Sequence, residues 1–331
     1  MADYLVDLRD IKFVVFNQIG VDKLLEQEKF SEYDADDFEA LLDEAIKQAR
    51  DIFWPLSISG DEIGAKWEDG NVTLPPGTKE AWDMMKENQL IGMNMSSEFG
   101  GMDLPQMVFT AVQDLYVGAN PALALTPMLS TGAGHLIEAF GTDYLKETYV
   151  EKMYTGEWSG TMCLTEPGAG TDVGNSKTKA YRQDDGSYLI EGNKIFITAG
   201  DHNLTDNVIH AVLARIEGDP AGTKGISLFV VPKYLVNDDG SCGDFNDVRC
   251  TGIEHKMGIH ASPTCQMAFG EDGKCKGWLL GNERDGMKLM FQMMNEARIG
   301  VGLQGAASAN AAYQQALAYS KERLQGPHVS K

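Results

Sequence analysis

Residues 163–174 read CLTEPGAGTDVG and have the composition of a loop that accommodates a phosphate. Glycines let the backbone approach a ligand closely, and threonine hydroxyls supply hydrogen bonds. The spacing differs from the G-x-G-x-x-G fingerprint of dinucleotide-binding folds, because Val173 stands where the third glycine should be. No Gly-Lys-Ser/Thr sequence follows either. The stretch therefore predicts a ligand-side loop that is of neither the Rossmann nor the Walker type.

The region before this loop, up to about residue 158, has a helical pattern. Apolar residues recur at helical spacing between Phe38 and Ala49. Three further helices are expected, over residues 79–90, 105–118 and 142–155. Residues 57–78 are rich in glycine and proline and predict an irregular connector on the surface.

The loop itself opens a region, residues 159–277, that has the pattern of strands. Apolar residues alternate on both sides of Gly192-Asn193, which predicts a hairpin turn at that dipeptide. Two more strands are expected over residues 208–214 and 226–232. This pattern predicts a small all-β domain inserted into a helical chain.

A third region, helical again, begins near Asp285. The run from Arg298 to Leu324 is rich in alanine and glycine, which predicts close packing in a bundle and is also compatible with contact to another subunit. So little chain cannot close a bundle, so we expect this domain to be incomplete. The sequence thus predicts a multidomain α+β fold in four parts. These are an N-terminal extension (1–34), a helical domain (35–158), a middle β domain (159–277) and the beginning of a C-terminal helical domain (278–331).

Composition excludes several classes of partner. The 28 basic and 49 acidic residues leave a net charge of −21, which argues against nucleic acid or an anionic membrane. No apolar run reaches the roughly 18 residues of a membrane span, and the acidic N-terminus does not resemble a leader, so a cytoplasmic location is expected. The five cysteines are expected to be reduced. His202, His255 and His260 lack metal-ligand spacing and are expected to be loop or surface residues, so no metal site is expected.

The helical, β, helical order and four motifs together resemble the acyl-CoA dehydrogenase family. The motifs are GEWSGTMCLTEPGAGTDVG at 156–174, EGNKIFITAG at 191–200, KMGIHASPTCQMAF at 256–269 and LLGNERDGMKLMFQMMNEARIGVGLQG at 279–305. The resemblance covers about residues 79–326. The N-terminal extension is similar to the branch that contains 3-methylmercaptopropionyl-CoA dehydrogenase. The resemblance implies the acyl-CoA dehydrogenase fold, with FAD bound between the β domain and the helical domains.

The resemblance also assigns roles to residues of the opening loop. Met162, Leu164 and Thr165 are expected along the isoalloxazine ring. Gly170 and Thr171 are expected to approach the cofactor or the phosphates of acyl-CoA, where a larger side chain would obstruct. Ordinary use of Thr165 and Thr171 at a strand end and in a turn is the alternative.

A second strand edge, at residues 196–198, is expected to face the ring as well. Phe196 and Ile197 would lie against the flavin, and Thr198 would offer its hydroxyl near N5. Many family members have tryptophan at the position of Phe196, so this chain keeps the stacking face and loses an N–H donor. A buried strand is the other reading of Phe196 and Ile197, and both readings can hold together.

The last helix carries four further positions that match the family. Arg323 and Gln325 resemble a pair that reaches the FAD of a neighbouring subunit, which implies a homodimer or homotetramer. A solvated helix end is the alternative for that pair. Asn295 and Arg298 match positions that contact acyl-CoA, with pairing on the helix surface as the alternative.

The reaction implied by the resemblance is α,β-dehydrogenation of an acyl-CoA, in which a glutamate removes the α-proton. That glutamate is expected beyond Lys331, so the chain is predicted to lack its base, as a truncated sequence or a gene fragment would. A minority of the family places the base at the position of Ala297. Glu296 is one residue away, on another helix face, and is predicted to be structural. Glu166 is predicted to hold its loop through hydrogen bonds.

Substrate and partner follow only from the resemblance. A short thioether acyl-CoA, as in dimethylsulfoniopropionate degradation, and a short or medium straight-chain acyl-CoA are both compatible with it. The methionine-rich helix 287–294 could line an adaptable pocket or be plain core. The electron acceptor is expected to be electron-transfer flavoprotein. An acyl-CoA oxidase or flavin monooxygenase of the same fold, and a non-catalytic binding subunit, are the competing functions.

Overall fold

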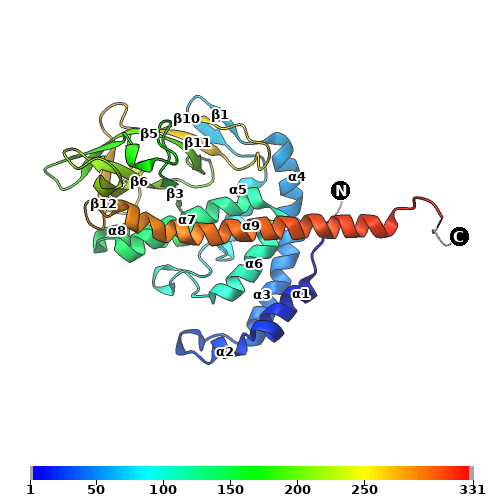
Figure 1. Cartoon of the computed structure of the whole chain (residues 1–331). Helices are drawn as coiled ribbons and strands as arrows, with labels where there is room; N and C mark the ends of the chain where they lie inside the picture. Colours follow the sequence, from blue (N-terminus) through cyan, green and yellow to red (C-terminus); the bar gives the residue numbers. More distant parts are fainter. Residues whose placement is uncertain (1–2, 328–331) are drawn as a thin grey trace.

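The computed structural model of the protein describes residues 3–327. A helical part comes first in the chain, the β domain follows it, and one long helix comes after the β domain (Figure 1). The helices before the β domain are α1 (Leu8–Lys12), α2 (Asp22–Leu25), α3 (Ala35–Gln48), α4 (Trp54–Ile63), α5 (Thr78–Glu87), α6 (Gln106–Ala119), α7 (Pro121–Phe140) and α8 (Asp143–Tyr154). The three helices expected over 79–90, 105–118 and 142–155 are confirmed as α5, α6 and α8.

The expected irregular connector over residues 57–78 is wrong in its first part. A π-helical segment, Ala49–Phe53, joins α3 to α4, so helix continues to Ile63. A short hairpin follows, formed by β1 (Lys66–Glu68) and β2 (Asn71–Thr73). Gly60 lies inside α4, and a Cβ there would stand 3.1 Å from the Cβ of Ala261. This glycine permits close packing and does not end the helix.

The 20-residue helix α7 has no counterpart among the expected helices. Asn120 caps its first turn by accepting a hydrogen bond from the backbone N–H of Leu123, and Pro121 occupies the first helical position. Its interior holds Pro127 and Gly134, residues that locally disfavour a helix. A Cβ on Gly134 would lie 2.8 Å from the ring of Tyr154, so tertiary packing explains a residue that looked like a helix breaker.

The β domain confirms the predicted all-β character of the middle region. One eight-stranded sheet has the order β10-β11-β5-β12-β7-β6-β3, with β4 paired to β5 and β6. The strands are β3 (Ser159–Cys163), β4 (Lys179–Arg182), β5 (Tyr188–Thr198), β6 (Val208–Ile216), β7 (Ile226–Pro232), β10 (Val248–Ile253), β11 (Thr264–Phe269) and β12 (Lys276–Leu280). A separate pair consists of β8 (Tyr234–Val236) and β9 (Cys242–Phe245).

The predicted hairpin at Gly192-Asn193 is wrong, because β5 runs through both residues without turning back. Its first half pairs with β4 and β12, and its second half pairs with β11. A Cβ on Gly192 would collide with Thr178. The glycine therefore marks a close approach where the strand changes partners.

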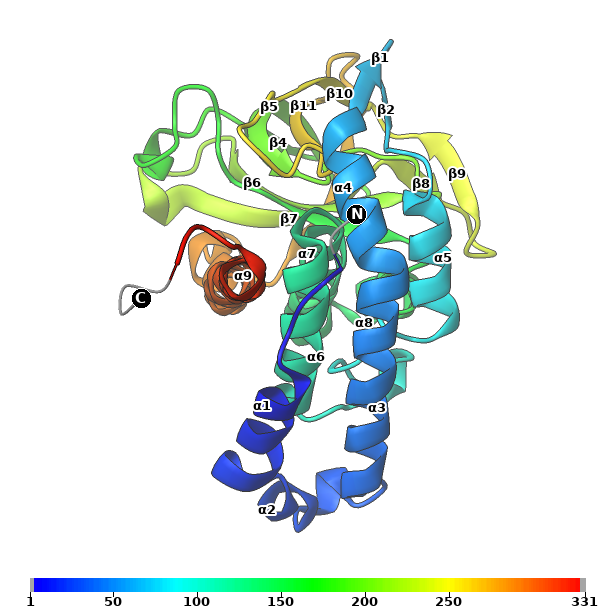
Figure 2. The same cartoon turned by 90° about the vertical axis from the view of Figure 1, so that its right-hand side faces the viewer.

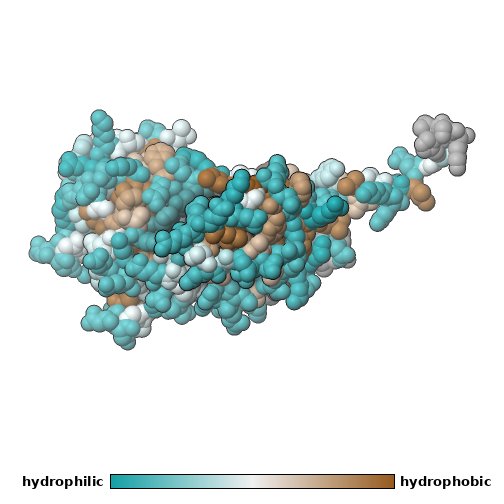
Figure 3. Space-filling model, turned by 90° about the horizontal axis from the view of Figure 1, so that it is seen from below, coloured by the Kyte–Doolittle hydropathy of each residue, from teal (hydrophilic) through white to brown (hydrophobic). Residues whose placement is uncertain are grey.

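The last helix, α9 (Gly286–Glu322), packs on α6, α7 and β7. Figure 2 looks along α9 and shows it beside α7, below the β domain. Leu289, Met290 and Met293 in its first turns are buried. Its far end extends past the other helices, and that protruding end carries hydrophobic residues among polar ones (Figures 1 and 3).

Two hydrophobic clusters form most of the core. The larger joins α3, α5 and α6 to one face of the sheet, and the second joins α7, α8 and α9 to β6 and β7. No helix between residues 3 and 327 has the length and apolar character needed to cross a bilayer. All five cysteines carry free thiols.

Candidate functional site

The loop at 163–174 leaves the sheet where β3 ends. Met162, Leu164 and Thr165 are partly buried at this edge, whereas Gly170 and Thr171 are exposed. The position of a Cβ on Gly170 is open, with the Cγ2 of Thr165 as its nearest neighbour at 3.7 Å. The backbone of the loop is thus accessible to a ligand from outside.

Glu166 anchors this loop from the inside. Its carboxylate accepts hydrogen bonds from the backbone N–H of Lys177 at 2.6 Å and of Thr178 at 3.1 Å. The hydroxyls of Ser176 and Thr178 and the ammonium of Lys194 also donate to it. Burial would raise the pKa of Glu166, but Lys194 and the hydroxyl donors outweigh burial and lower that pKa to about 2. The prediction that Glu166 holds its loop is confirmed.

The end of β5 lies beside this loop, since the backbone N–H of Ile195 donates to the carbonyl of Thr165 at 2.9 Å. Phe196 has a φ of 60°, and the register with β11 shifts there. This bulge turns the Phe196 ring outward, where it is 58% exposed, while Ile197 is buried. The buried-strand reading therefore holds for Ile197 and is wrong for Phe196. A left-handed conformation at a bulky residue is strained, and such strain gathers at functional sites.

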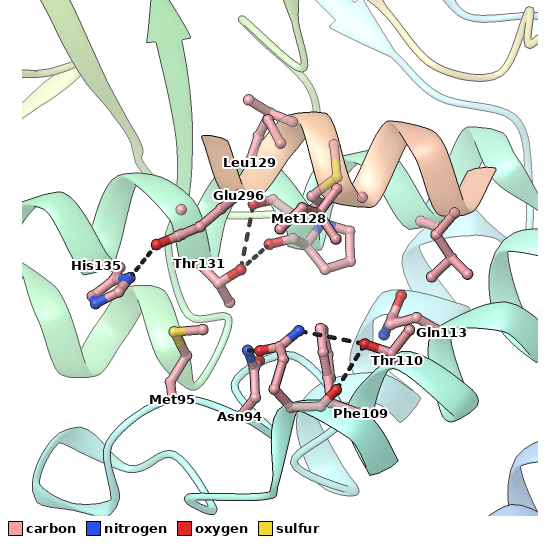
Figure 4. A pocket seen from close by; sticks show the side chains of 18 of the residues that line it. Asn94, Met95, Phe109, Thr110, Gln113, Met128, Leu129, Thr131, His135 and Glu296 are labelled. Atoms are coloured by element: carbon pink, nitrogen blue, oxygen red, sulfur yellow. Dashed lines mark hydrogen bonds and ion pairs between the residues drawn. The ribbon is translucent and has the colours of Figure 1, made fainter. Parts of the chain in front are cut away.

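A cavity of about 700 Å³ lies between α6, α7, α9 and the segment 91–103. Its two walls are visible in Figure 4, with Asn94, Phe109, Thr110 and Gln113 on one side and Met128, Leu129, Thr131, His135 and Glu296 on the other. Leu129 and Met293, which line it, belong to the hydrophobic cluster against which Met162 and Leu164 pack. The cavity therefore shares its packing with the β3 edge.

The cavity has a polar and an apolar lining. The amide of Asn94 donates to the side-chain carbonyl of Gln106 at 2.9 Å, and the hydroxyl of Thr110 donates to the backbone carbonyl of Gln106 at 2.7 Å. Met95, Met128 and Met293 supply flexible apolar surface. The sequence reasoning missed all of these except Met293, because none belongs to a motif.

The glutamates on the cavity wall are engaged by neighbours. Glu296 pairs with the Nδ1 of His135 at 2.9 Å, and Glu138 accepts from the hydroxyl of Tyr154. The hydrogen bond to Glu296 raises the pKa of His135, against the effect of burial. Both carboxylates therefore have partners, and the structural role of Glu296 stays a prediction. Ala297 also lines the cavity.

Thr198, at the end of β5, is partly buried, and the other predicted site residues are exposed on or beyond α9. Arg298 donates to the side-chain carbonyl of Asn295 at 2.6 Å, as pairing on the helix surface would produce. Arg323 directly follows the last residue of α9 and donates to the hydroxyl of Tyr319, within the helix, at 2.6 Å. Arg323 and the nearby Gln325 stand at the protruding end of the chain, away from the loop at 163–174 (Figure 1).

The histidines fall into two environments. The expectation that His202 is a loop or surface residue is wrong in part, because its loop folds inward and the ring is 5% exposed. Its Nε2 lies 3.0 Å from the hydroxyl of Ser159, and burial lowers its pKa to about 3. His260 is partly exposed, and its backbone N–H donates to the carboxylate of Asp61 at 2.9 Å. No group of three or more His, Cys, Asp or Glu residues within 3–327 is arranged to hold a metal ion.

A helical layer, a β domain with an open loop at its edge, and a cavity between α6, α7 and α9 define an acyl-CoA dehydrogenase fold. The family model described as "Acyl-CoA dehydrogenase, N-terminal domain" matches residues 61–157, and "Acyl-CoA dehydrogenase, middle domain" matches residues 161–271. The chain belongs to the acyl-CoA dehydrogenase family.

Curated relatives are similar over nearly the whole chain. The 3-methylmercaptopropionyl-CoA dehydrogenase of Ruegeria pomeroyi is 41% identical over 98% of this chain and 55% of its own length. A butyryl-CoA dehydrogenase of Syntrophomonas wolfei is 42% identical over 98% of this chain and 54% of its own length. The chain thus spans about half the length of these curated relatives.

Solved structures share the fold. A chain in a structure titled as the electron transferring flavoprotein of Acidaminococcus fermentans has a TM-score of 0.72 at 28% identity, covering 90% of this chain and 72% of that one. Butyryl-CoA dehydrogenase from Megasphaera elsdenii has a TM-score of 0.72 at 26% identity, and the match covers 89% of this chain and 72% of that one. An acyl-CoA dehydrogenase from Bacillus anthracis, titled as complexed with FAD, has a TM-score of 0.71 at 24% identity, covering 89% and 45%.

Proposed function

We propose that this chain supplies the cofactor side and part of the substrate cavity of an FAD-dependent acyl-CoA dehydrogenase. The observation that carries the proposal is the junction of the loop and β5 at the edge of the β domain. The open loop after β3 and the outward-facing Phe196 on β5 lie side by side, and Met162 and Leu164 at this edge pack against the hydrophobic cluster whose Leu129 and Met293 line the cavity. Family membership gives this junction its chemical meaning.

The residues at the β edge suit a flavin. Phe196 offers an exposed aromatic face, and the partly buried Met162 and Leu164 frame an apolar edge for a flat ring. Thr165 and Thr198 would supply hydroxyl groups toward the ring's polar rim, and Gly170 and Thr171 would leave room for phosphates. FAD, when bound, supplies a hydride acceptor for the β-hydrogen of the substrate. Arg323 and Gln325 are proposed to serve the cofactor of a neighbouring subunit in a homodimer or homotetramer.

The cavity would receive the acyl chain. Its methionines at 95, 128 and 293 offer polarizable surface that suits a thioether sulfur as well as methylene groups. The favoured substrate is a short thioether acyl-CoA such as 3-methylmercaptopropionyl-CoA. A short straight-chain acyl-CoA is the second candidate, favoured by the similar identity of a butyryl-CoA dehydrogenase. Asn295 and Arg298 are proposed to contact the CoA moiety from α9.

The base that removes the α-proton is proposed to be a glutamate on a segment that follows Lys331. Glu166 is committed to its loop, and Glu138 and Glu296 to Tyr154 and His135. A carboxylate poised as a general base needs a raised pKa, whereas that of Glu166 is held low. Electron-transfer flavoprotein is the proposed electron acceptor, and the cytoplasm the proposed location.

The test uses a chain extended past Lys331 by its natural reading frame and purified with FAD. We expect the purified protein to show yellow flavin absorbance. Under anaerobic conditions, 3-methylmercaptopropionyl-CoA should bleach this absorbance, and butanoyl-CoA should bleach it more slowly. Rapid peroxide formation in air without an added acceptor would identify an oxidase instead. Flavin that no acyl-CoA bleaches, or a protein that binds no flavin, would contradict the proposed dehydrogenase.

A further inference from the structure

Lys194 has a burial and a set of contacts that the proposed reaction does not use. The side chain stands on β5, two residues before Phe196, and is fully buried. Its ammonium donates to the backbone carbonyl of Leu164 at 3.1 Å and to the carboxylate of Glu166 at 2.9 Å. One cation thus holds both the β3 edge and the loop that follows it.

Glu166 extends this linkage to the far side of the loop. Its carboxylate receives four hydrogen bonds from residues 176–178, where the chain leads into β4. The loop between residues 166 and 176 is therefore closed at its base by a single buried carboxylate. Gly168, within it, has no neighbouring atom where a Cβ would stand. The loop has firm attachments at its base and open space at its tip.

A buried ion pair is poor evidence for stability, because removing two charges from water offsets most of their attraction. A well-packed apolar pair would serve the core as well. The geometry instead gives the pair a positional effect, since its backbone partners lie at the two ends of the loop, at Leu164 and at residues 177 and 178.

We propose that Glu166 and Lys194 are positioning residues that lock the loop at 163–174 against β5. The lock preorganises the backbone of Leu164 and Thr165 and the open glycines before a ligand arrives. The consequence for cofactor binding rests on the proposed function. The locking itself does not, because it is a property of the chain without any ligand.

The same domain provides a matched control. Asp201 and Lys233 form a second ion pair, at 2.7 Å, that is largely buried, with side chains 3% and 17% exposed. Asp201 also accepts from the backbone N–H of His202. Neither residue is hydrogen-bonded to the loop at 163–174. Loss of this pair removes a buried charge pair from the β domain and leaves the loop attached.

The experiment measures amide hydrogen exchange by mass spectrometry on peptides that span residues 163–178. The variants are Glu166→Gln, Lys194→Met and the double Glu166→Gln/Lys194→Met, with Asp201→Asn/Lys233→Met as control. We expect exchange in these peptides to rise by about tenfold or more in the loop variants and to change little in the control. The double variant carries no unpaired buried charge, so it tests the proposal even where a single variant does not fold.

Affinity for FAD, read by quenching of flavin fluorescence, gives a second readout that a purely structural role would not move. We expect the double loop variant to bind FAD about tenfold more weakly than the wild type, and the control variant to bind it as the wild type does. The comparison is made between variants that have the same melting temperature. If amide exchange in residues 163–178 of the loop variants is no faster than in the control variant, the proposal is overturned. If the wild-type chain binds no FAD, the proposed function fails, and the exchange result alone decides the role of the pair.

Discussion

The edge of the β domain and the cavity between the helices are organised by different forces. At the β edge, a fully buried lysine and a buried glutamate tie three backbone segments together. At the cavity, the walls are apolar side chains and amides, and the ion pair between His135 and Glu296 is 37% and 42% exposed. The difference separates a region held in one geometry from a region whose shape can adapt to what it contains.

The largest effect should come from removing one charge of the buried pair. Lys194→Met leaves Glu166 ionised without its partner, and we expect a loss of about 3–5 kcal/mol in the free energy of unfolding. Urea denaturation measures this loss. Glu296→Gln, which removes a charge from the exposed pair at the cavity, should cost far less, and equal losses would contradict the contrast between the two regions.

On the cavity side, the expected cost is one of packing. Met293 is 2% exposed and lines the cavity, so Met293→Ala should lower the free energy of unfolding by about 2–4 kcal/mol. Met287→Ala on the same helix is the control, because Met287 is only partly buried. If Met293→Ala and Met287→Ala lower the denaturation midpoint equally, Met293 in the cavity wall is packed no more tightly than Met287.

Acid should weaken the anchor at the β edge. The pKa of Glu166 is lowered from 4.5 to about 2, so its contribution to stability is fully present above pH 4.5 and is lost as the pH falls toward 2. Glu166→Gln should flatten this part of the curve of stability against pH. Thermal unfolding at a series of pH values between these limits measures it, and an unchanged slope in the variant would refute the assignment.

Thr178→Val should have a smaller effect on the same anchor. The change removes one hydroxyl donor to Glu166 and leaves the backbone N–H donor and the ion pair in place. We expect a loss of about 1 kcal/mol by chemical denaturation. A loss as large as that of Lys194→Met would mean that the hydroxyl, and not the ammonium, dominates the anchor.

The smallest effect should come from the pair at the cavity. The pKa of His135 is raised above 6.5, so its ion pair contributes fully below pH 6.5, and the contribution is lost as the pH rises through the raised pKa. Because both side chains are more than one-third exposed, we expect the ion pair to contribute less than about 1 kcal/mol to the free energy of unfolding. His135→Gln should abolish this dependence in denaturation midpoints near neutral pH, and added salt should weaken it in the wild type.

Local patterns predicted those parts of the molecule that depend on neighbouring residues. Helices α5, α6 and α8 and strands β6 and β7 follow from periodicity and turn residues, and the motif at 163–174 led to the family. The role of Glu166 followed from its place in a polar loop. Prediction failed at Gly192, which was taken as a turn and instead permits a close approach to Thr178, and it named no helix where α7 lies.

The cavity could not have been predicted, because its lining comes from five separate segments and none of Asn94, Gln106 or Met128 belongs to a motif. By itself, the sequence determined the family, the order of helical and β regions and the acidic surface, because these depend on composition and short-range spacing. Only the tertiary structure decided which side chains meet. It turned Phe196 outward at a bulge, and it enclosed Lys194 beside Glu166, 28 residues away in the chain. Those contacts depend on how separate strands pack, and no local pattern encodes that packing.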